Sequence, residues 1–235
     1  MRELPHRTGL YIIEHMEADD NTPEALPPWV LLEYSHILRR TCYPSSSVSN
    51  KVYFTNLSSR CATSLSNQLA SPSSSSASPP SLSNFKATTN SVESLIISGT
   101  LPSKPRICLL DPRAAQAISP NDANEFDGFL FGGILGDDPP RDRTKELRKL
   151  GFPSRHLGNV QMTTDTAVYV TSLVIDGQQQ LAEIPYIEYP TIQFNPKESV
   201  EMPFRYVMNE IGEPILPSGM KELLYEDMNK GFDDF

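Results

Sequence analysis

The chain has 235 residues, of which 38% are hydrophobic, a low share for a globular protein, and 21 are proline, a high number. Its 20 basic and 29 acidic residues give a net charge of −9, which argues against a basic nucleic-acid-binding surface and suits a basic protein partner. Three cysteines without a CxxC pair, and few histidines, fit neither a disulfide framework nor a zinc site, so we expect no bound metal.

The first half of the chain predicts two strands and a helix beside a low-complexity insertion. Apolar runs at 10–13 and 52–54 predict short strands, and apolar residues at helical spacing after two prolines predict a helix over 29–38. In residues 71–83, Ser and Pro fill eleven of thirteen positions, a composition that buries too little apolar surface to offset its ordering entropy. We expect 58–91 to be a flexible insertion within one domain over 10–224, and 225–235 to be an acidic tail.

The second half alternates further strand and helix signals. Residues 106–110 and 128–134 have the apolar pattern of buried strands, 141–150 predict a charged helix, and 155–157 predict a brief strand. Residues 163–175 are rich in β-branched side chains, which permits a strand, but Thr-Thr-Asp at their start favours a capped helix. The alternation predicts an α/β fold with a mainly parallel sheet that binds ligands at the carboxyl ends of its strands.

Two glycine-bearing segments follow such strand ends. In the first, FGGILGDDPPRDR at 131–143, the glycines permit a tight turn and a close approach to a ligand, and Asp137 stands in a cluster of charges. The segment matches neither a dinucleotide-binding motif nor a phosphate loop, and a turn without a ligand is its alternative interpretation. In the second, LGNVQMTTDTA at 157–167, hydroxyls and amides lead into a helix and could hold a polar ligand, although a capped helix alone also explains them. His15, His36 and His156 have no Ser or Cys partner at motif spacing and are expected to be packing or surface residues.

Six motifs in order carry a resemblance to a known family: IIEHME, WVLLEYS, CLLDPRA, FGGILGDDPPRDRTKEL, LGNVQMTTDTA and EMPFRYV. Together they resemble the SPOUT-class protein arginine N-methyltransferases of yeasts and fungi, which modify a ribosomal protein of the small subunit. The resemblance covers nearly all of residues 10–224 except 45–100. It implies an α/β domain with a deep trefoil knot toward its C-terminal half, S-adenosylmethionine as methyl donor, and no metal.

The resemblance also implies which residues form the site. The donor would be wrapped by three strand-end segments that comprise Leu110, Asp111, Pro112, Phe131, Gly132, Gly133, Gly136, Leu157, Gly158, Gln161, Met162 and Thr163. Because a guanidinium is a planar cation, carboxylates must orient it for attack by a nitrogen lone pair. Asp137 is the first candidate for this role, followed by Glu14, Glu33, Asp142 and Asp165.

Other functions stay open at this point. Many SPOUT proteins methylate RNA, so an RNA methyltransferase is the main alternative, and a catalytically inactive donor-binding module is another. Residues 45–100 carry a net charge of +2, which leaves −11 on the other 179 residues and counts against RNA. The protein substrate would be basic, and we expect a monomer. No apolar run reaches the roughly 18 residues that span a bilayer, and residues 1–10 carry charges instead of a signal-peptide core, so we expect a soluble, cytoplasmic protein.

Overall fold

A parallel β-sheet forms the centre of the computed structural model, which describes residues 9–16, 26–42, 50–70, 84–133 and 144–230. The sheet has the strand order β3-β2-β1-β5-β4-β6, and all of its neighbouring strands are parallel. Its strands are β1 Leu10–His15, β2 Lys51–Thr55, β3 Phe85–Ala87, β4 Ile107–Leu110, β5 Gly128–Gly133 and β6 Ser154–Arg155. Parallel strands need crossover connections, and helices supply most of them here.

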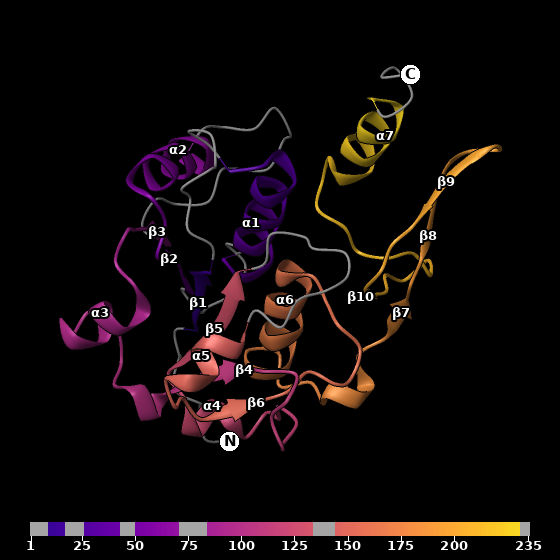
Figure 1. Ribbon diagram of the computed structural model, residues 1–235. Coiled ribbons are helices and arrows are strands. Elements are labelled where there is room, and N and C mark those ends of the chain that lie inside the picture. Colours follow the sequence, from indigo (N-terminus) through magenta and orange to yellow (C-terminus); the bar gives the residue numbers. More distant parts are fainter. Residues whose placement is uncertain (1–8, 17–25, 43–49, 71–83, 134–143, 231–235) are drawn as a thin grey trace.

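Helices cover both faces of this sheet (Figure 1). The two-residue period of a strand explains why: Tyr11 and Ile13 join one apolar cluster, while Leu10 and Ile12 join the other. α1 Pro28–Thr41, α2 Ser59–Ala70 and α6 Thr164–Ile175 contribute to the first cluster, and α3 Val92–Ile97 and α5 Thr144–Lys149 contribute to the second. The short α4 Asp122–Glu125 also packs against the first cluster. This three-layer arrangement confirms the predicted α/β fold with a mainly parallel sheet.

The predicted boundaries hold for most elements and need correction in three places. Residues 85–87, which we assigned to the flexible insertion, form the edge strand β3, which pairs with β2. Residues 59–70, which we assigned to the flexible insertion, form α2, because Cys61, Ala62, Leu65 and Leu69 give it a buried apolar face. The acidic tail predicted at 225–235 overlaps the last helix, α7 Met220–Lys230. Residues 71–83 and 231–235 lie outside the described residues. Residues 134–143 also lie outside them, so the trefoil knot, which depends on their course, stays a prediction.

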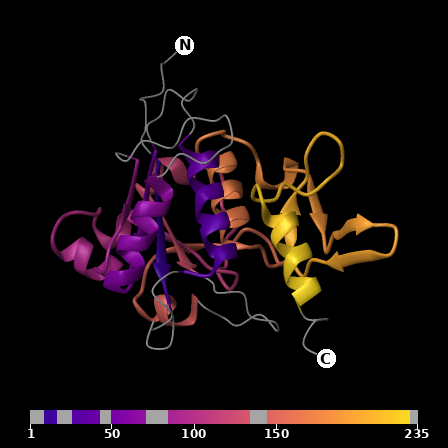
Figure 2. The ribbon, with the colours of Figure 1, turned by 90° about the horizontal axis from the view of Figure 1, so that it is seen from above.

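The C-terminal part forms a smaller unit beside the sheet (Figure 2). Strands β7 Tyr186–Glu188 and β10 Arg205–Val207 pair antiparallel, and β8 Thr191–Asn195 and β9 Glu198–Glu201 form a hairpin. A separate apolar cluster around Ile192, Met202 and Tyr206 holds these strands against α7. The unit contacts the larger one through β10 against α6 and α7 against α1. No helix in the described part of the chain is long and apolar enough to cross a membrane.

Candidate active site

The three segments predicted to hold the donor leave the same edge of the sheet. β5 lies beside β4, and β4 lies beside β6, so their carboxyl ends are neighbours. Leu110 and Phe131 at these ends are themselves buried in the core, as is Met162 farther along the chain. A ligand at this edge of the sheet can therefore contact mainly the backbone groups of these residues and little of their side chains.

The glycine turn that follows β6 is held from two sides. Gly158 has φ +107°, which an L side chain rarely adopts, and its N–H donates to Nδ1 of His156 over 3.0 Å. The N–H of Arg205 in β10 donates to the carbonyl of Gln161 over 2.9 Å. Arg205 in turn pairs with Glu188 and lies over the ring of Tyr186. The turn is thus fastened to the C-terminal unit.

Gly133 at the end of β5 serves the packing of the fold. A Cβ there would lie 3.2 Å from the carbonyl oxygen of Glu14, from Ile13 and from the hydroxyl of Tyr34. The missing side chain thus lets β5, β1 and α1 approach closely, and its predicted contact with a donor stays a prediction. Gly136, Asp137 and Asp142 lie outside the described residues, and so do the predictions for them.

Asp111 anchors α5 to the end of β4. Its buried carboxylate accepts from Nε of Arg148 at 2.5 Å and from another Arg148 nitrogen at 2.6 Å, and it also accepts the N–H of Arg113. Burial works to raise the pKa of Asp111, but these hydrogen bonds outweigh it and hold the pKa below its usual value. The carboxylate is committed to contacts within the fold.

Replacing Asp111 with Asn is expected to lower the free energy of unfolding by about 1–2 kcal/mol at neutral pH. The full value for a buried ion pair does not apply, because the Arg148 side chain is 30% exposed. Since the folded-state pKa is depressed, this stabilisation is present above the unfolded pKa, about 3.9, and is lost as pH falls through the folded value. Urea unfolding of Asp111→Asn and of the wild type, at neutral and at acid pH, measures this difference in the free energy of unfolding. An equal difference at both pH values would contradict a stabilising role of the charged Asp111 carboxylate.

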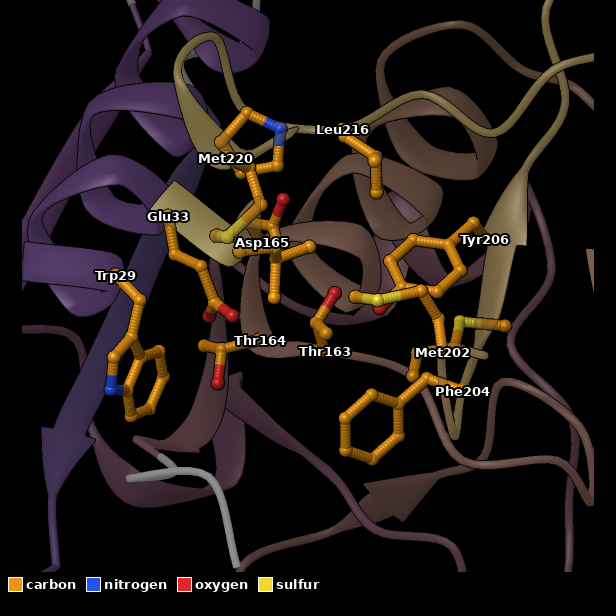
Figure 3. Close-up of a pocket in the computed structure, with 13 residues that line it drawn as sticks. Trp29, Glu33, Thr163, Thr164, Asp165, Met202, Phe204, Tyr206, Leu216 and Met220 are labelled. Atoms are coloured by element: carbon orange, nitrogen blue, oxygen red, sulfur yellow. The ribbon is translucent and has the colours of Figure 1, made fainter. Parts of the chain in front are cut away.

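A cavity of about 150 Å³ lies between the two units, next to the glycine turn (Figure 3). Figure 3 shows Glu33 and Asp165 at its centre, with Trp29 on one side and Met202, Phe204 and Tyr206 on the other. The lining residues come from α1, from the start of α6 and the turn before it, from β10 and the segment before it, and from α7 and the loop before it: Trp29, Glu33, Met162, Thr163, Thr164, Asp165, Met202, Phe204, Tyr206, Leu216, Pro217, Met220 and Leu224. The wall is mostly apolar and aromatic, and two carboxyl groups are set into it.

Glu33 reaches from α1 to the N-terminus of α6. Glu33 is 6% exposed, and its carboxyl group accepts the backbone N–H of Asp165, in the first turn of α6, where helix N–H groups lack partners within the helix. Thr163, at the N-cap, makes no such bond and donates instead to the hydroxyl of Thr166. Burial, followed by the nearby charge of Asp165, raises the pKa of Glu33 well above its usual value.

Asp165 presents one free oxygen. Its Oδ2 lies 2.7 Å from Nδ1 of His36, whereas Oδ1 is buried and has no hydrogen-bond partner among the described residues. The hydroxyl of Tyr206 is likewise buried and unpartnered within the described ranges. Burial, with the nearby charges of Asp165 and Glu33, raises the pKa of Tyr206 above its usual value, so it stays a neutral donor. The cavity thus holds polar groups whose hydrogen-bonding capacity the fold does not use.

Glu14 lies away from this cavity. Alternation along β1 turns its side chain to the face of Ile12, where it accepts from the hydroxyl of Thr55 and the N–H of Val92. Burial raises its pKa, and it serves the start of α3. Of the five predicted carboxylates, the structure brings together Glu33 and Asp165. Among the described residues, no cluster of three or more His, Cys, Asp or Glu side chains could hold a metal.

Five apolar and aromatic residues that line the cavity were not predicted as site residues: Trp29, Met202, Phe204, Tyr206 and Met220. Trp29 begins the motif WVLLEYS, and Met202, Phe204 and Tyr206 lie within EMPFRYV, so two motifs that supported the resemblance contained the available signal.

Comparisons with known proteins agree on one group. The family model described as protein arginine N-methyltransferase SFM1-like matches residues 10–231. Protein arginine N-methyltransferase SFM1 of Saccharomyces cerevisiae is 42% identical over 228 residues, which are 95% of this chain and 98% of the relative. The crystal structure of the yeast enzyme complexed with SAM superposes with a TM-score of 0.74 at 38% identity, covering 96% of this chain and 93% of that one. The structure complexed with SAH has a TM-score of 0.69 at 40% identity, covering 91% and 93%.

Proposed function

The chain belongs to the SFM1-like family of protein arginine N-methyltransferases, and from this premise we propose which residues carry the reaction and what the substrate is. It is an enzyme that uses S-adenosylmethionine (SAM) and releases S-adenosylhomocysteine (SAH). The glycine turn 157–163 holds the donor, Glu33 and Asp165 hold the acceptor guanidinium, and the acceptor belongs to a ribosomal protein of the small subunit.

One observation carries this assignment. Met162 and Thr163, at the end of the turn predicted to hold the donor, line the same cavity as Glu33 and Asp165. A methyl transfer needs the donor carbon and the acceptor nitrogen in contact, and positioning of the two reactants supplies much of the rate. Donor-holding and acceptor-holding groups in one small cavity meet this requirement.

The cavity suits an arginine side chain. A guanidinium is a cation with planar N–H donors, and the carboxyl groups of Glu33 and Asp165 are acceptors beside an aromatic and thioether wall. Burial and, after it, the nearby charge of Asp165 disfavour the charged form of Glu33 and raise its pKa. A guanidinium beside Glu33 would favour the ionised form of this residue, so acceptor binding and the charge on Glu33 support each other.

The donor fits the strand-end segments. The turn at Gly158, the backbone after Leu110 and the end of β5 at Gly132 bring main-chain groups to one edge of the sheet. Bound SAM supplies a methyl group on a sulfonium sulfur, which departs as a neutral thioether when the carbon–sulfur bond breaks. The acceptor nitrogen forms the new bond to carbon and must lose one proton. Oδ1 of Asp165, unpartnered among the described side chains, is the base that we assign.

The net charge of −9 supports a basic ribosomal protein as substrate, because an acidic enzyme attracts it and repels RNA. In keeping with this, we propose that the enzyme acts as a monomer in the cytoplasm. An RNA methyltransferase of the same fold remains the second candidate.

Incubation with radiolabelled SAM and small ribosomal subunits tests the substrate. We expect label in one basic protein band that is removed by protease and unaffected by ribonuclease. Label in RNA would favour the second candidate. The absence of transfer to either, with intact SAM binding by calorimetry, would indicate an inactive binding module.

A further inference from the structure

Two polar residues of α1, His36 and Arg40, form a chain of hydrogen bonds that ends at Asp165. His36 is 6% exposed, and its Nδ1 lies 2.7 Å from Oδ2 of Asp165. One turn later, Nε of Arg40 donates to Nε2 of His36 over 2.9 Å. The Arg40 guanidinium also lies 4.9 Å from the ring centre of Tyr169 on α6, which holds it in place. Arg40, His36 and Asp165 thus form a row that ends at the cavity.

The row fixes the tautomer of His36. An arginine side chain has donors only, so Nε2 of His36 must carry a lone pair to accept from Arg40. The proton of the neutral ring therefore sits on Nδ1 and is donated to Oδ2 of Asp165. This assignment follows from the hydrogen bonds alone.

The consequence concerns Asp165. Rotation about the last side-chain bond of an aspartate is weakly restricted, and a carboxylate in the first turn of a helix is drawn to nearby N–H groups. The bond from His36 occupies Oδ2 and leaves Oδ1 unpartnered among the described groups. We infer that His36 is a positioning residue, locked by Arg40 in the Nδ1–H form, which holds Asp165 with one oxygen free for the acceptor arginine. This inference rests on the proposed function.

The same geometry argues against proton transport through His36. A relay would need Nε2 to pass a proton outward, but Nε2 faces an arginine, which cannot take one up. The charged groups that contact the ring are Asp165 on α6, at Nδ1, and Arg40 on α1, at Nε2. Beyond them, Glu33 on α1 and Tyr206 on β10 lie near Asp165, and Tyr169 on α6 lies beside Arg40. Of these, Arg40 alone contacts Nε2 in the described part of the chain.

Three variants separate positioning from packing. His36→Asn keeps a side-chain N–H near the position of Nδ1, His36→Gln places its amide near Nε2 instead, and His36→Phe keeps the ring but loses both nitrogens. We expect kcat to fall about tenfold or more in the Phe and Gln variants and much less in the Asn variant, with SAM affinity unchanged in all three. Equal kcat values in the three variants, at equal melting temperatures, would overturn the inference.

Two further measurements do not depend on the substrate assignment. Ring ¹⁵N chemical shifts of the full chain with SAH should show a neutral His36 protonated on Nδ1, and Asp165→Asn should shift the Nδ1 signal. Protonation on Nε2, or on both nitrogens near neutral pH, would overturn the inference even if protein methylation is confirmed. In Arg40→Met the ¹⁵N signal of Nε2 should move, because the hydrogen bond from Arg40 is lost. An unmoved Nε2 signal would contradict this contact. If no protein is methylated but the Nδ1–H form is seen, the proposed function is wrong, while the assignment of the Nδ1–H tautomer to His36 is confirmed.

Discussion

Replacing Glu33 with Gln is expected to lower kcat for protein methylation at least about 100-fold, which corresponds to about 2.7 kcal/mol of transition-state stabilisation. The substitution keeps the shape of the side chain and an acceptor for the N–H of Asp165, but it removes the charge that orients the guanidinium. SAM affinity should change little, because the donor is held by the turn 157–163. Methylation rates at saturating substrate, with calorimetry for SAM, measure the two effects separately.

The same variant should be more stable than the wild type. The pKa of Glu33 is raised in the fold, so its stability contribution is present below the unfolded pKa of about 4.3 and is lost as pH rises through the folded value. Gln has no such loss, so its melting temperature should exceed that of the wild type by about 2 °C or more at alkaline pH and match it near pH 4. Higher stability with lower activity is typical of a functional residue that strains its fold.

Glu14→Gln is the matched control. Glu14 is also a buried carboxyl group with a raised pKa, but it lies on the other face of the sheet. We expect its variant to keep kcat in the folded fraction. If Glu14→Gln lost turnover and Glu33→Gln kept it, the acceptor site would not be the cavity between the two units.

Replacing Gly158 with Val should weaken SAM binding by at least about tenfold, or about 1.4 kcal/mol. At φ +107° a β-branched side chain is strained by about 1–3 kcal/mol, so the turn would relax to another conformation. The new Cβ would also lie 3.1 Å from Nη1 of Arg205, whose guanidinium is held by Glu188 and Tyr186. Both effects displace the backbone proposed to face the donor.

Gly151→Val separates this effect from backbone strain in general. Gly151 also has a positive φ, +76°, and a Cβ there would meet nothing within 4 Å. We expect a loss of stability similar in kind but normal SAM affinity, measured by calorimetry on the folded proteins. Normal affinity in Gly158→Val itself would remove this turn from the donor site.

Much of the fold follows from local signals. Five of the six parallel strands lie at or near predicted strand segments, and Thr-Thr-Asp correctly favoured a helix at 164–175 despite its β-branched residues. β3 was missed because it has three residues, Phe-Lys-Ala, which are too few and too polar to form an apolar run. The cap was predicted less well, because the group that bonds the first turn is Glu33, which lies more than 130 residues earlier. α2 was missed because polar residues such as serine, threonine and the amides make up most of its exposed side, while its buried face has only four apolar residues.

The site depends on tertiary contacts that no local pattern contains. Glu33 and Asp165 were both among five candidate carboxylates, but only the packing of α1 against α6 brings them together. For the same reason His36 was expected to be a packing or surface residue, although it contacts Asp165 across 129 positions of sequence. Gly133 has a packing role that the sequence did not indicate, since a Cβ there would lie 3.2 Å from the hydroxyl of Tyr34, and its contact with the donor stays a prediction.

The most direct test is a crystal structure of the full chain with SAH and a short peptide containing the arginine that is labelled by SAM. We expect SAH to lie against the turn 157–163, and the guanidinium to lie in the cavity and donate to Glu33 and to Oδ1 of Asp165. A guanidinium bound outside this cavity, without contact to Glu33 or Asp165, would contradict the assignment of these two residues to the acceptor site.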